Sequence, residues 1–454
     1  MKRLSRIKVY KLLEQYDYEI KHFFDEKITM VFAPNGSGKT ILLKLINSVF
    51  SNDYLGMYEL PFQSIEFQFT DSSLLVITKK LKTDENSVTS EYLHYEIINN
   101  SLNDSLNHSF EVEFTKELPP LNSITRNLPF MRRIAPREWF DTVQKRRLKL
   151  NEVLDEYSEL FNMSYNVEDN KKDLIKDLLS VQLIETNRLH DLKSLEENWR
   201  RRGYNNDSYY EEIETNTVNF LSDEIRRLIS NKLKEFASVS QEKDRTFPSR
   251  LVSLMELGEK RIDVNSISKK LGELDDYRRK LSTIGLIDSQ NETFRGFTEN
   301  PGSYVANVLA LYIEDTKEKL AVFNELEQRI TLFLKIINDK YKDKKLIIDK
   351  NEGFIIKLKS GRELKNINHL SSGEQHILVM YFNLLFEEVP RQNKLVLIDE
   401  PEISLHIEWQ QDFLSDLQEI KKLTNVDFIV ATHSPDIMNG HWEISVGLED
   451  EGDR

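Results

Sequence analysis

The chain has no cysteine among its 454 residues, which excludes disulfide bonds, thiolate metal sites and cysteine nucleophiles. It also lacks an apolar run of about 18 residues, the minimum for a membrane-spanning helix, and an apolar signal segment near its first residue. We therefore expect a cytoplasmic protein that has no membrane partner. The net charge of −14 argues against a protein that wraps nucleic acid, although it leaves room for a local basic surface.

What the chain does contain is a glycine-rich turn between an apolar run, residues 28–32, and a helical pattern over residues 41–50. Strand, glycine-rich turn and helix form the setting of a phosphate-binding loop. Gly36 and Gly38 allow backbone N–H groups to face phosphate oxygens without a Cβ in the way. The positive end of the following helix dipole favours an anion at the same place.

Two side chains of this loop match the chemistry of a nucleoside triphosphate. Lys39 can reach the β- and γ-phosphates, and the hydroxyl of Thr40 can bind Mg²⁺. Ala33 stands where the usual first glycine of such a loop is found, which leaves the phosphate-facing part intact. The predicted nucleotide-binding residues of the loop are Asn35, Gly36, Ser37, Gly38, Lys39 and Thr40.

A second apolar run, residues 394–398, ends in the carboxylates Asp399 and Glu400. In an enzyme with a phosphate-binding loop, Asp399 would hold Mg²⁺ and Glu400 would take a proton from the attacking water. Carboxylate pairs at strand ends are common by chance, but residues 401–406 that follow this pair strengthen the functional interpretation.

Two further motifs point to the same chemistry. Ser372 and Gly373 open a helical pattern, where a hydroxyl and a backbone N–H can bind an anion; a simple helix cap is the alternative. His433 follows another apolar run, residues 428–431, and can contact a γ-phosphate or the attacking water. A structural role is the more common one for a single histidine, but the order of the motifs favours a functional role.

Segments of alternating polarity surround the phosphate-binding loop, at residues 6–12, 16–23, 27–32, 64–69, 73–81, 92–98 and 110–114. Those after the loop predict an antiparallel sheet beside the nucleotide site. From residue 191 the pattern is helical, with a turn-rich break near residues 285–303. The two sides predict a coiled-coil hairpin about 50 Å long at 1.5 Å per residue, or else ordinary amphipathic helices. The predicted seam is Leu320, Phe323, Leu326, Ile330, Phe333 and Ile337.

Together, these motifs resemble the ABC ATPase superfamily, in the branch of SMC, RecF and OLD-like heads. The resemblance implies an α/β fold: an ABC-type P-loop ATPase head with an antiparallel β subdomain and a helical insertion. The expected domains are an N-terminal lobe at 1–190, an insertion with a short antiparallel coiled-coil hairpin at 191–345, and a C-terminal lobe at 346–454. In that family two heads enclose two ATP molecules, so that Ser372 and Gly373 would act on the nucleotide of a second subunit.

The resemblance also implies a glutamine that helps to bind Mg²⁺. Gln182, between a predicted strand and the insertion, is the first candidate, and Gln63 and Gln68 are the alternatives. The cofactors implied are ATP and Mg²⁺, and the enzymatic activity implied is hydrolysis of ATP to ADP and phosphate. The sequence after His433 is too short for the Toprim nuclease domain of OLD-type proteins, so we expect no nuclease domain in this chain.

Four segments, residues 132–139, 184–189, 240–248 and 437–443, resemble stand-alone ATPases of bacterial anti-phage operons. The resemblance is to the AriA family, the ATPase subunits of PARIS defence systems, with the PtuA family of Septu systems as the alternative. It implies a homo-oligomer that holds a separate nuclease, Toprim-like of the AriB type, inactive until a phage trigger protein is recognised. In Septu systems the partner is an HNH nuclease. A further alternative for the function of this chain is a DNA-repair ATPase of the SMC or RecF kind.

One basic stretch, Met131 to Lys149, stands out in the acidic chain. It is either a DNA-contacting strip, a binding site for an acidic trigger that imitates DNA, or a solvated surface. Its basic residues are Arg132, Arg133, Arg137, Lys145, Arg146, Arg147 and Lys149.

Overall fold

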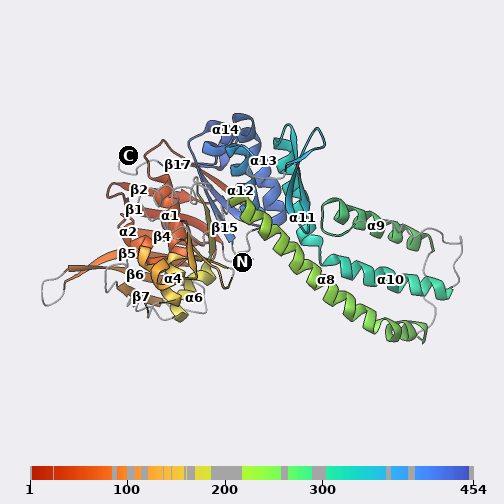
Figure 1. Ribbon diagram of the computed structural model, residues 1–454. Helices are drawn as coiled ribbons and strands as arrows, with labels where there is room; N and C mark the ends of the chain where they lie inside the picture. Colours follow the sequence, from red (N-terminus) through yellow and green to blue (C-terminus); the bar gives the residue numbers. More distant parts are fainter. Residues whose placement is uncertain are drawn as a thin grey trace. The chain divides into compact units, whose positions relative to one another are not determined.

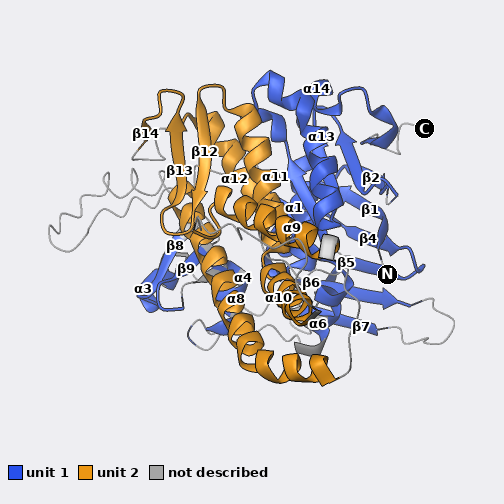
Figure 2. Ribbon diagram, turned by 90° about the vertical axis from the view of Figure 1, so that its right-hand side faces the viewer, with its two compact units in different colours: residues 1–212, 387–454 blue, residues 213–386 orange. Residues whose placement is uncertain are grey.

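The computed structural model describes residues 3–23, 25–83, 89–99, 108–113, 121–135, 138–144, 146–157, 160, 169–185, 217–256, 264–288, 303–364, 370–386 and 394–448. The chain divides into two compact units, and unit 2 joins most of the predicted insertion to the first part of the predicted C-terminal lobe (Figure 1, Figure 2). Unit 1 comprises residues 1–212 and 387–454, and unit 2 comprises residues 213–386.

A five-stranded sheet in unit 1 has the order β11-β15-β16-β3-β17, and each neighbouring pair of strands is parallel. Its three central strands are almost entirely buried, as expected for apolar runs in a parallel sheet with both faces covered. The strand bounds are β3 Ile28–Phe32, β11 Ser180–Ile184, β15 Lys394–Asp399, β16 Asp427–Thr432 and β17 Ser445–Gly447.

A six-stranded antiparallel sheet, β2-β1-β4-β5-β6-β7, shares one hydrophobic core with helix α1 (Lys39–Phe50) and the parallel sheet. The alternating pattern of its strands places Ile65 and Phe67 in this core, where Phe67 contacts the ring of Phe50 at 4.8 Å between centroids. The bounds are β1 Leu4–Leu12, β2 Tyr16–Lys21, β4 Ser64–Phe69, β5 Leu74–Thr83, β6 Thr89–Ile98 and β7 His108–Glu113.

The remaining elements of unit 1 include a small antiparallel sheet, β10-β9-β8, with a core of its own around the buried Trp139. Its strands are β8 Met131–Ala135, β9 Glu138–Asp141 and β10 Arg146–Lys149. The helices are α2 Tyr54–Glu59, α3 Leu121–Asn127, α4 Leu150–Glu156, α6 Asp169–Leu178, α13 Ile407–Thr424 and α14 Pro435–Met438, with 3₁₀ turns η2 Pro401–Ser404 and η3 Trp442–Ile444.

Unit 2 combines helices with a three-stranded antiparallel sheet, β12-β13-β14. Phe333 of α11 lies in its core against Phe354 of β13 and Phe382 of α12, with ring centroids 5.8 and 6.2 Å away. The helices are α8 Thr217–Glu256, α9 Val264–Thr283, α10 Ser303–Ala321, α11 Asn324–Lys340 and α12 Ser372–Phe386, and the strands are β12 Lys344–Asp349, β13 Gly353–Leu358 and β14 Glu363–Leu364.

The predicted α/β P-loop ATPase fold, with its antiparallel sheet and helical insertion, is confirmed. The insertion differs in detail from the two-armed hairpin, because α10 packs against both α8 and α9. The predicted seam is also divided between α10 and α11, and Phe333 on α11 packs on the core of unit 2 rather than on a long partner arm. The bounds of the three predicted domains stay predictions; unit 2 groups residues 346–386 with the helices. Within the described ranges, no helix has both the length and the apolarity that crossing a membrane requires.

Candidate active site

The register of the parallel sheet places three sequence motifs at one edge. Phe32, which precedes the glycine-rich loop, pairs with Thr432 of β16, and Asp399 of β15 pairs with Ala431. The carboxyl ends of β3, β15 and β16 therefore lie together. In open α/β sheets, ligands generally bind at this end of the strands. This explains how residues far apart in the sequence meet at one site.

The glycine-rich loop follows β3 and ends where α1 begins at Lys39. Gly36 and Gly38 have φ values of 86° and 81°, a left-handed conformation that side chains with a Cβ rarely adopt. A Cβ on Gly38 would also approach Leu13 Cδ1 to 3.3 Å. The Tyr18 hydroxyl donates to the Ser37 carbonyl at 2.9 Å, which fixes the loop to β2. The loop thus has the backbone that a phosphate cradle requires.

Lys39 and Thr40 connect this loop to the end of β15. The buried Lys39 Nζ donates to the carbonyls of Ala33 and Pro34 at 2.8 and 2.9 Å, and lies 3.8 Å from Glu400 Oε1. Thr40 Oγ1 donates to Asp399 Oδ2 at 2.8 Å. The hydroxyl and the carboxylate predicted to bind one Mg²⁺ are therefore already in contact, so this donor set fits the ion.

Glu400 has an unusual backbone, with φ 41° and ψ 63°. A left-handed conformation costs a residue with a Cβ of order 1–3 kcal/mol and must be stabilised by its surroundings. Here the Glu400 N–H donates to the Ala431 carbonyl of β16 at 2.9 Å. Its carboxylate is largely buried, with 19% of the side chain exposed. Strain of this kind is concentrated at functional sites, which agrees with the role predicted for Glu400.

His433 follows β16 directly, and its Nδ1 atom lies near two carboxylates. Nδ1 is 3.8 Å from Glu400 Oε1 and 3.0 Å from Glu402 Oε1. The side chain is 38% exposed, so it remains open to a substrate. The role of Glu402 was not predicted from the sequence. The only signal for it there is its place in the segment after Glu400.

The predicted anion-binding residues Ser372 and Gly373 belong to unit 2, at the start of α12. Ser371 caps this helix: its hydroxyl and N–H donate to Glu374 Oε2, and Glu374 N donates back to the Ser371 hydroxyl. This reciprocal capping box leaves the backbone donors of the next two residues as the ones available for an anion. Ser372 is exposed, which suits a surface that acts on another molecule.

Two contacts within unit 2 hold this turn in place. Lys344 Nζ pairs with Glu374 Oε2 at 2.7 Å, and the Tyr341 hydroxyl donates to the Glu374 carbonyl at 2.9 Å. Burial acts to raise the pKa of Glu374, but hydrogen bonds from Lys344 and Ser371 outweigh it and place the pKa below its usual value. The carboxylate that caps α12 is therefore ionised at neutral pH.

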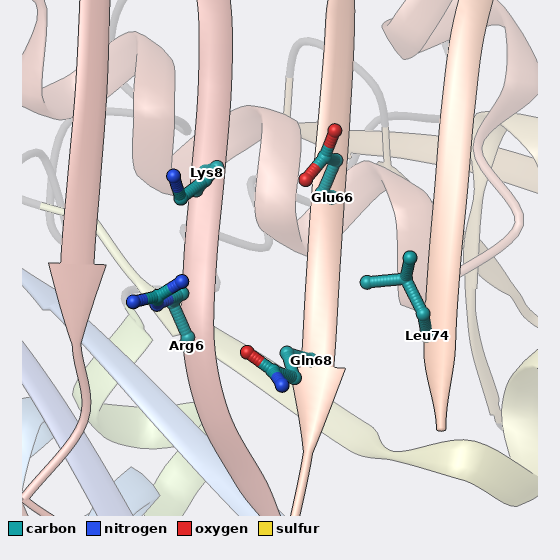
Figure 3. Close-up of a pocket in the computed structure, with 5 residues that line it drawn as sticks. All are labelled: Arg6, Lys8, Glu66, Gln68 and Leu74. Atoms are coloured by element: carbon teal, nitrogen blue, oxygen red, sulfur yellow. The ribbon is translucent and has the colours of Figure 1, made fainter. Parts of the chain in front are cut away.

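The glutamine predicted to bind Mg²⁺ stays a prediction. Gln182 is buried in the middle of β11, in register with Val396 and three positions before the level of Asp399. Gln68 lies on β4 and faces away from the core that contains α1, beside Arg6 and Leu74 in a small hollow (Figure 3). The structure therefore does not bring Gln68 to the glycine-rich loop.

The basic stretch forms part of the β10-β9-β8 sheet, and its function also stays a prediction. Arg132 is exposed, whereas the Arg133 guanidinium lies over the Trp139 ring at 5.6 Å. Partial burial lowers the pKa of Arg133. Arg137 and Lys145 lie outside the described residues, as do residues 186–189 of a segment that resembles anti-phage ATPases.

The fold and this group of residues define a P-loop ATPase. The model of the AAA ATPase domain family matches the chain over residues 6–438. Because the match covers nearly the whole chain, the protein belongs to this family, whose members bind and hydrolyse ATP. The match agrees with the nucleotide chemistry predicted from the sequence motifs.

Solved structures of SMC head domains align with nearly the whole chain, at low identity. The head from Pyrococcus furiosus, bound to the C-terminal domain of ScpA, is 15% identical, with 99% of this chain and 94% of that chain covered and a TM-score of 0.36. The head from Thermotoga maritima is 10% identical, with coverages of 98% and 94% and a TM-score of 0.31. The head from Pyrococcus yayanosii is 16% identical, with coverages of 98% and 95% and a TM-score of 0.32. These superpositions are too weak to assign a function.

Proposed function

We propose that the protein hydrolyses ATP at the carboxyl edge of its parallel sheet. The observation that carries this proposal is the contact between Thr40 and Asp399 at 2.8 Å, with Lys39 and Glu400 beside it. The backbone of residues 35–38 and the Lys39 ammonium bind the phosphates, while Thr40 and Asp399 hold Mg²⁺, with Gln182 proposed as an additional ligand. When bound, Mg²⁺ neutralises charge on the transferring phosphoryl group.

Glu400 is proposed as the base that takes a proton from the attacking water, and His433 as the residue that contacts the γ-phosphate or that water. Both side chains lie at the same edge as Lys39, and burial of Glu400 limits its exchange with bulk water. ATP turnover and nucleotide binding by Lys39→Ala and Glu400→Gln variants test this assignment.

The site is proposed to be completed by a second copy of the chain. Ser372 and Gly373 lie at an exposed helix start, where backbone donors can face a γ-phosphate held by another subunit. The protein would then form at least a head-to-head dimer when ATP binds. Mass photometry with and without ATP, on the Glu400→Gln variant that retains the nucleotide, measures this assembly directly.

The biological role that we propose is regulation of a separate nuclease in anti-phage defence. The support comes from the segments at residues 132–139, 184–189, 240–248 and 437–443, which resemble the AriA family. On this proposal the oligomer binds a Toprim-like nuclease of the AriB type and holds it inactive. Recognition of a phage trigger protein changes the assembly and releases the nuclease, as in a two-state switch biased by ligands.

Co-purification with the product of the neighbouring gene tests this role. A Toprim-like partner that remains bound in the resting complex, and is released when phage proteins are present, supports the proposal. An HNH nuclease partner would indicate a Septu-type system instead. Hydrolysis that is stimulated by DNA and falls steeply with salt would indicate a DNA-repair ATPase.

A further inference from the structure

One buried carboxylate beside the active site has no role in the proposed chemistry. Glu402 lies in the turn after Glu400, and 7% of the residue is exposed. Its Oε1 atom accepts hydrogen bonds from the Thr432 hydroxyl at 2.7 Å and from the His433 N–H at 2.8 Å. The His433 Nδ1 atom lies 3.0 Å from the same oxygen. A single oxygen therefore contacts both the backbone and the ring of His433.

A second side chain, Gln410, contacts the residue that follows His433. Gln410 of α13 accepts a hydrogen bond from the Ser434 hydroxyl at 2.8 Å, while its amide donates to the Leu405 carbonyl at 3.1 Å. Ser434 is thereby tied to the turn that follows Glu400. The residues on both sides of His433 are thus fixed to the segment between β15 and α13.

We propose that Glu402 and Gln410 are positioning residues that set the distance between His433 and Glu400. This inference rests on the proposed ATPase site, and it adds two residues to which neither the motifs nor the family match assign a role. Glu402 contacts Thr432 and His433, so it acts through His433.

The geometry shows what this positioning achieves. A carboxylate close to Nδ1 attracts a ring that carries a proton there. The Glu402 carboxylate is also closer to the ring than Glu400, which is 3.8 Å away. Glu402 therefore holds the Nδ1 side of the ring nearer to itself than to Glu400.

A double-mutant cycle tests the proposal on the full-length protein, with phosphate release as the assay. Glu402→Ala should lower kcat about tenfold, a part of the roughly 10²–10⁴-fold that a positioned acid–base group contributes, and should leave KM for ATP within about twofold. In a His433→Ala background the same change should lower kcat less than about twofold, because residues that act as a unit are non-additive. Equal losses in both backgrounds would overturn the proposal.

Glu402→Gln protects the test against misfolding, because the amide oxygen still accepts from Thr432 and from the His433 N–H. It should fold like the parent protein and recover part of the lost kcat. A Glu402→Gln variant with the parent's kcat, together with a folded Glu402→Ala variant that is equally active, would contradict the inference.

Gln410→Ala should lower kcat about threefold, roughly the effect of one neutral hydrogen bond, and the adjacent exposed Gln411→Ala is the matched control. Equal kcat for the two variants would remove Gln410 from the proposal. The Glu400→Gln variant distinguishes a failure of the proposed ATPase site from a failure of the positioning role. If it retains activity, the proposed ATPase site is wrong; if it is inactive while all Glu402 variants turn over normally, only the positioning role is wrong.

Discussion

The two ends of the parallel sheet in unit 1 are built in opposite ways. At the carboxyl end, Glu400 has a strained backbone, and its carboxylate lies 3.8 Å from both Lys39 Nζ and His433 Nδ1. At the amino end, Asp427 accepts hydrogen bonds from Arg3 Nε at 3.1 Å and Nη2 at 2.5 Å. The Glu400 carboxylate thus has longer contacts with its charged neighbours than Asp427 has with Arg3.

The amino end also includes contacts of the buried residues His22 and Thr29. His22 Nε2 lies 3.5 Å from Asp427, and His22 Nδ1 lies 2.7 Å from the Thr29 hydroxyl, which accepts from Phe23 N at 2.9 Å. Arg3 and His22 flank the first two strands of the antiparallel sheet, so this cluster joins the two sheets of unit 1. We expect the Asp427 cluster to contribute mainly to stability, and the longer contacts of Glu400 to leave its carboxylate available for a ligand.

The largest expected effect is on turnover by Glu400→Gln. Loss of the proposed base should lower kcat by about 100-fold or more, whereas ATP binding and the melting temperature should stay near those of the parent protein. Phosphate release measures turnover, and titration with a fluorescent ATP analogue measures binding. The exposed Glu408→Gln is the control. Parent-like turnover by Glu400→Gln would mean that the carboxyl end is not the catalytic end.

Lys39→Ala comes next. Removal of the ammonium should weaken ATP binding about 10- to 100-fold, because charge-assisted hydrogen bonds to phosphate are lost. Isothermal titration calorimetry with ATP and Mg²⁺ gives the affinity directly. Lys44→Ala on the same helix, where the lysine is partly exposed and pairs with Glu185 at 3.6 Å, should bind normally. Unchanged affinity in Lys39→Ala would contradict the phosphate-binding role of the loop.

The parts of the candidate site that are contiguous motifs can be recognised in the sequence alone. Residues 35–40 form a strand–turn–helix motif whose chemistry is local, and Asp399 and His433 each end an apolar run. The parallel strand order then brings these motifs to one edge, which is a general property of α/β sheets.

Other parts of the site depend on contacts between distant residues, and no local pattern predicts them. Glu402 reaches His433 across 31 positions, and the Tyr18 hydroxyl reaches the Ser37 carbonyl across 19. In the helical insertion, too, the local sequence pattern does not determine which residues pack together. The spacing at Leu320 to Ile337 fits either a coiled-coil seam or a core-packed helix, and the choice depends on partners such as Phe354 and Phe382.

Asp427→Asn tests the stabilising end of the sheet. It should lower the free energy of unfolding by about 1–3 kcal/mol at pH 7, because buried donors lose a charged acceptor, while kcat at a permissive temperature should stay within about twofold. Urea denaturation measures the stability. The control is Asp412→Asn on α13. A loss of turnover without a loss of stability would reverse the contrast between the two ends.

The pH dependence of this contribution has a definite sign. Burial acts to raise the pKa of Asp427, but hydrogen bonds from His22 and Arg3 outweigh it and lower the pKa. A lowered folded-state pKa means that the stabilisation is complete above the unfolded-state value of about 3.9 and is lost as pH falls through the folded-state pKa. The stability difference between the parent protein and Asp427→Asn should therefore shrink below about pH 4.

Tyr18→Phe has the smallest expected effect, and it tests whether the antiparallel sheet supports the carboxyl end as well. Phenylalanine keeps the buried ring and its stack on Tyr16 at 5.3 Å but loses the hydrogen bond to the Ser37 carbonyl. One neutral hydrogen bond contributes about 0.5–1.5 kcal/mol. If it holds the loop in its phosphate-binding conformation, ATP affinity should fall about two- to tenfold, with kcat at saturating ATP nearly unchanged. Tyr16→Phe is the matched control. Equal affinities of the two variants would mean that the glycine-rich loop keeps its conformation without the hydrogen bond from β2.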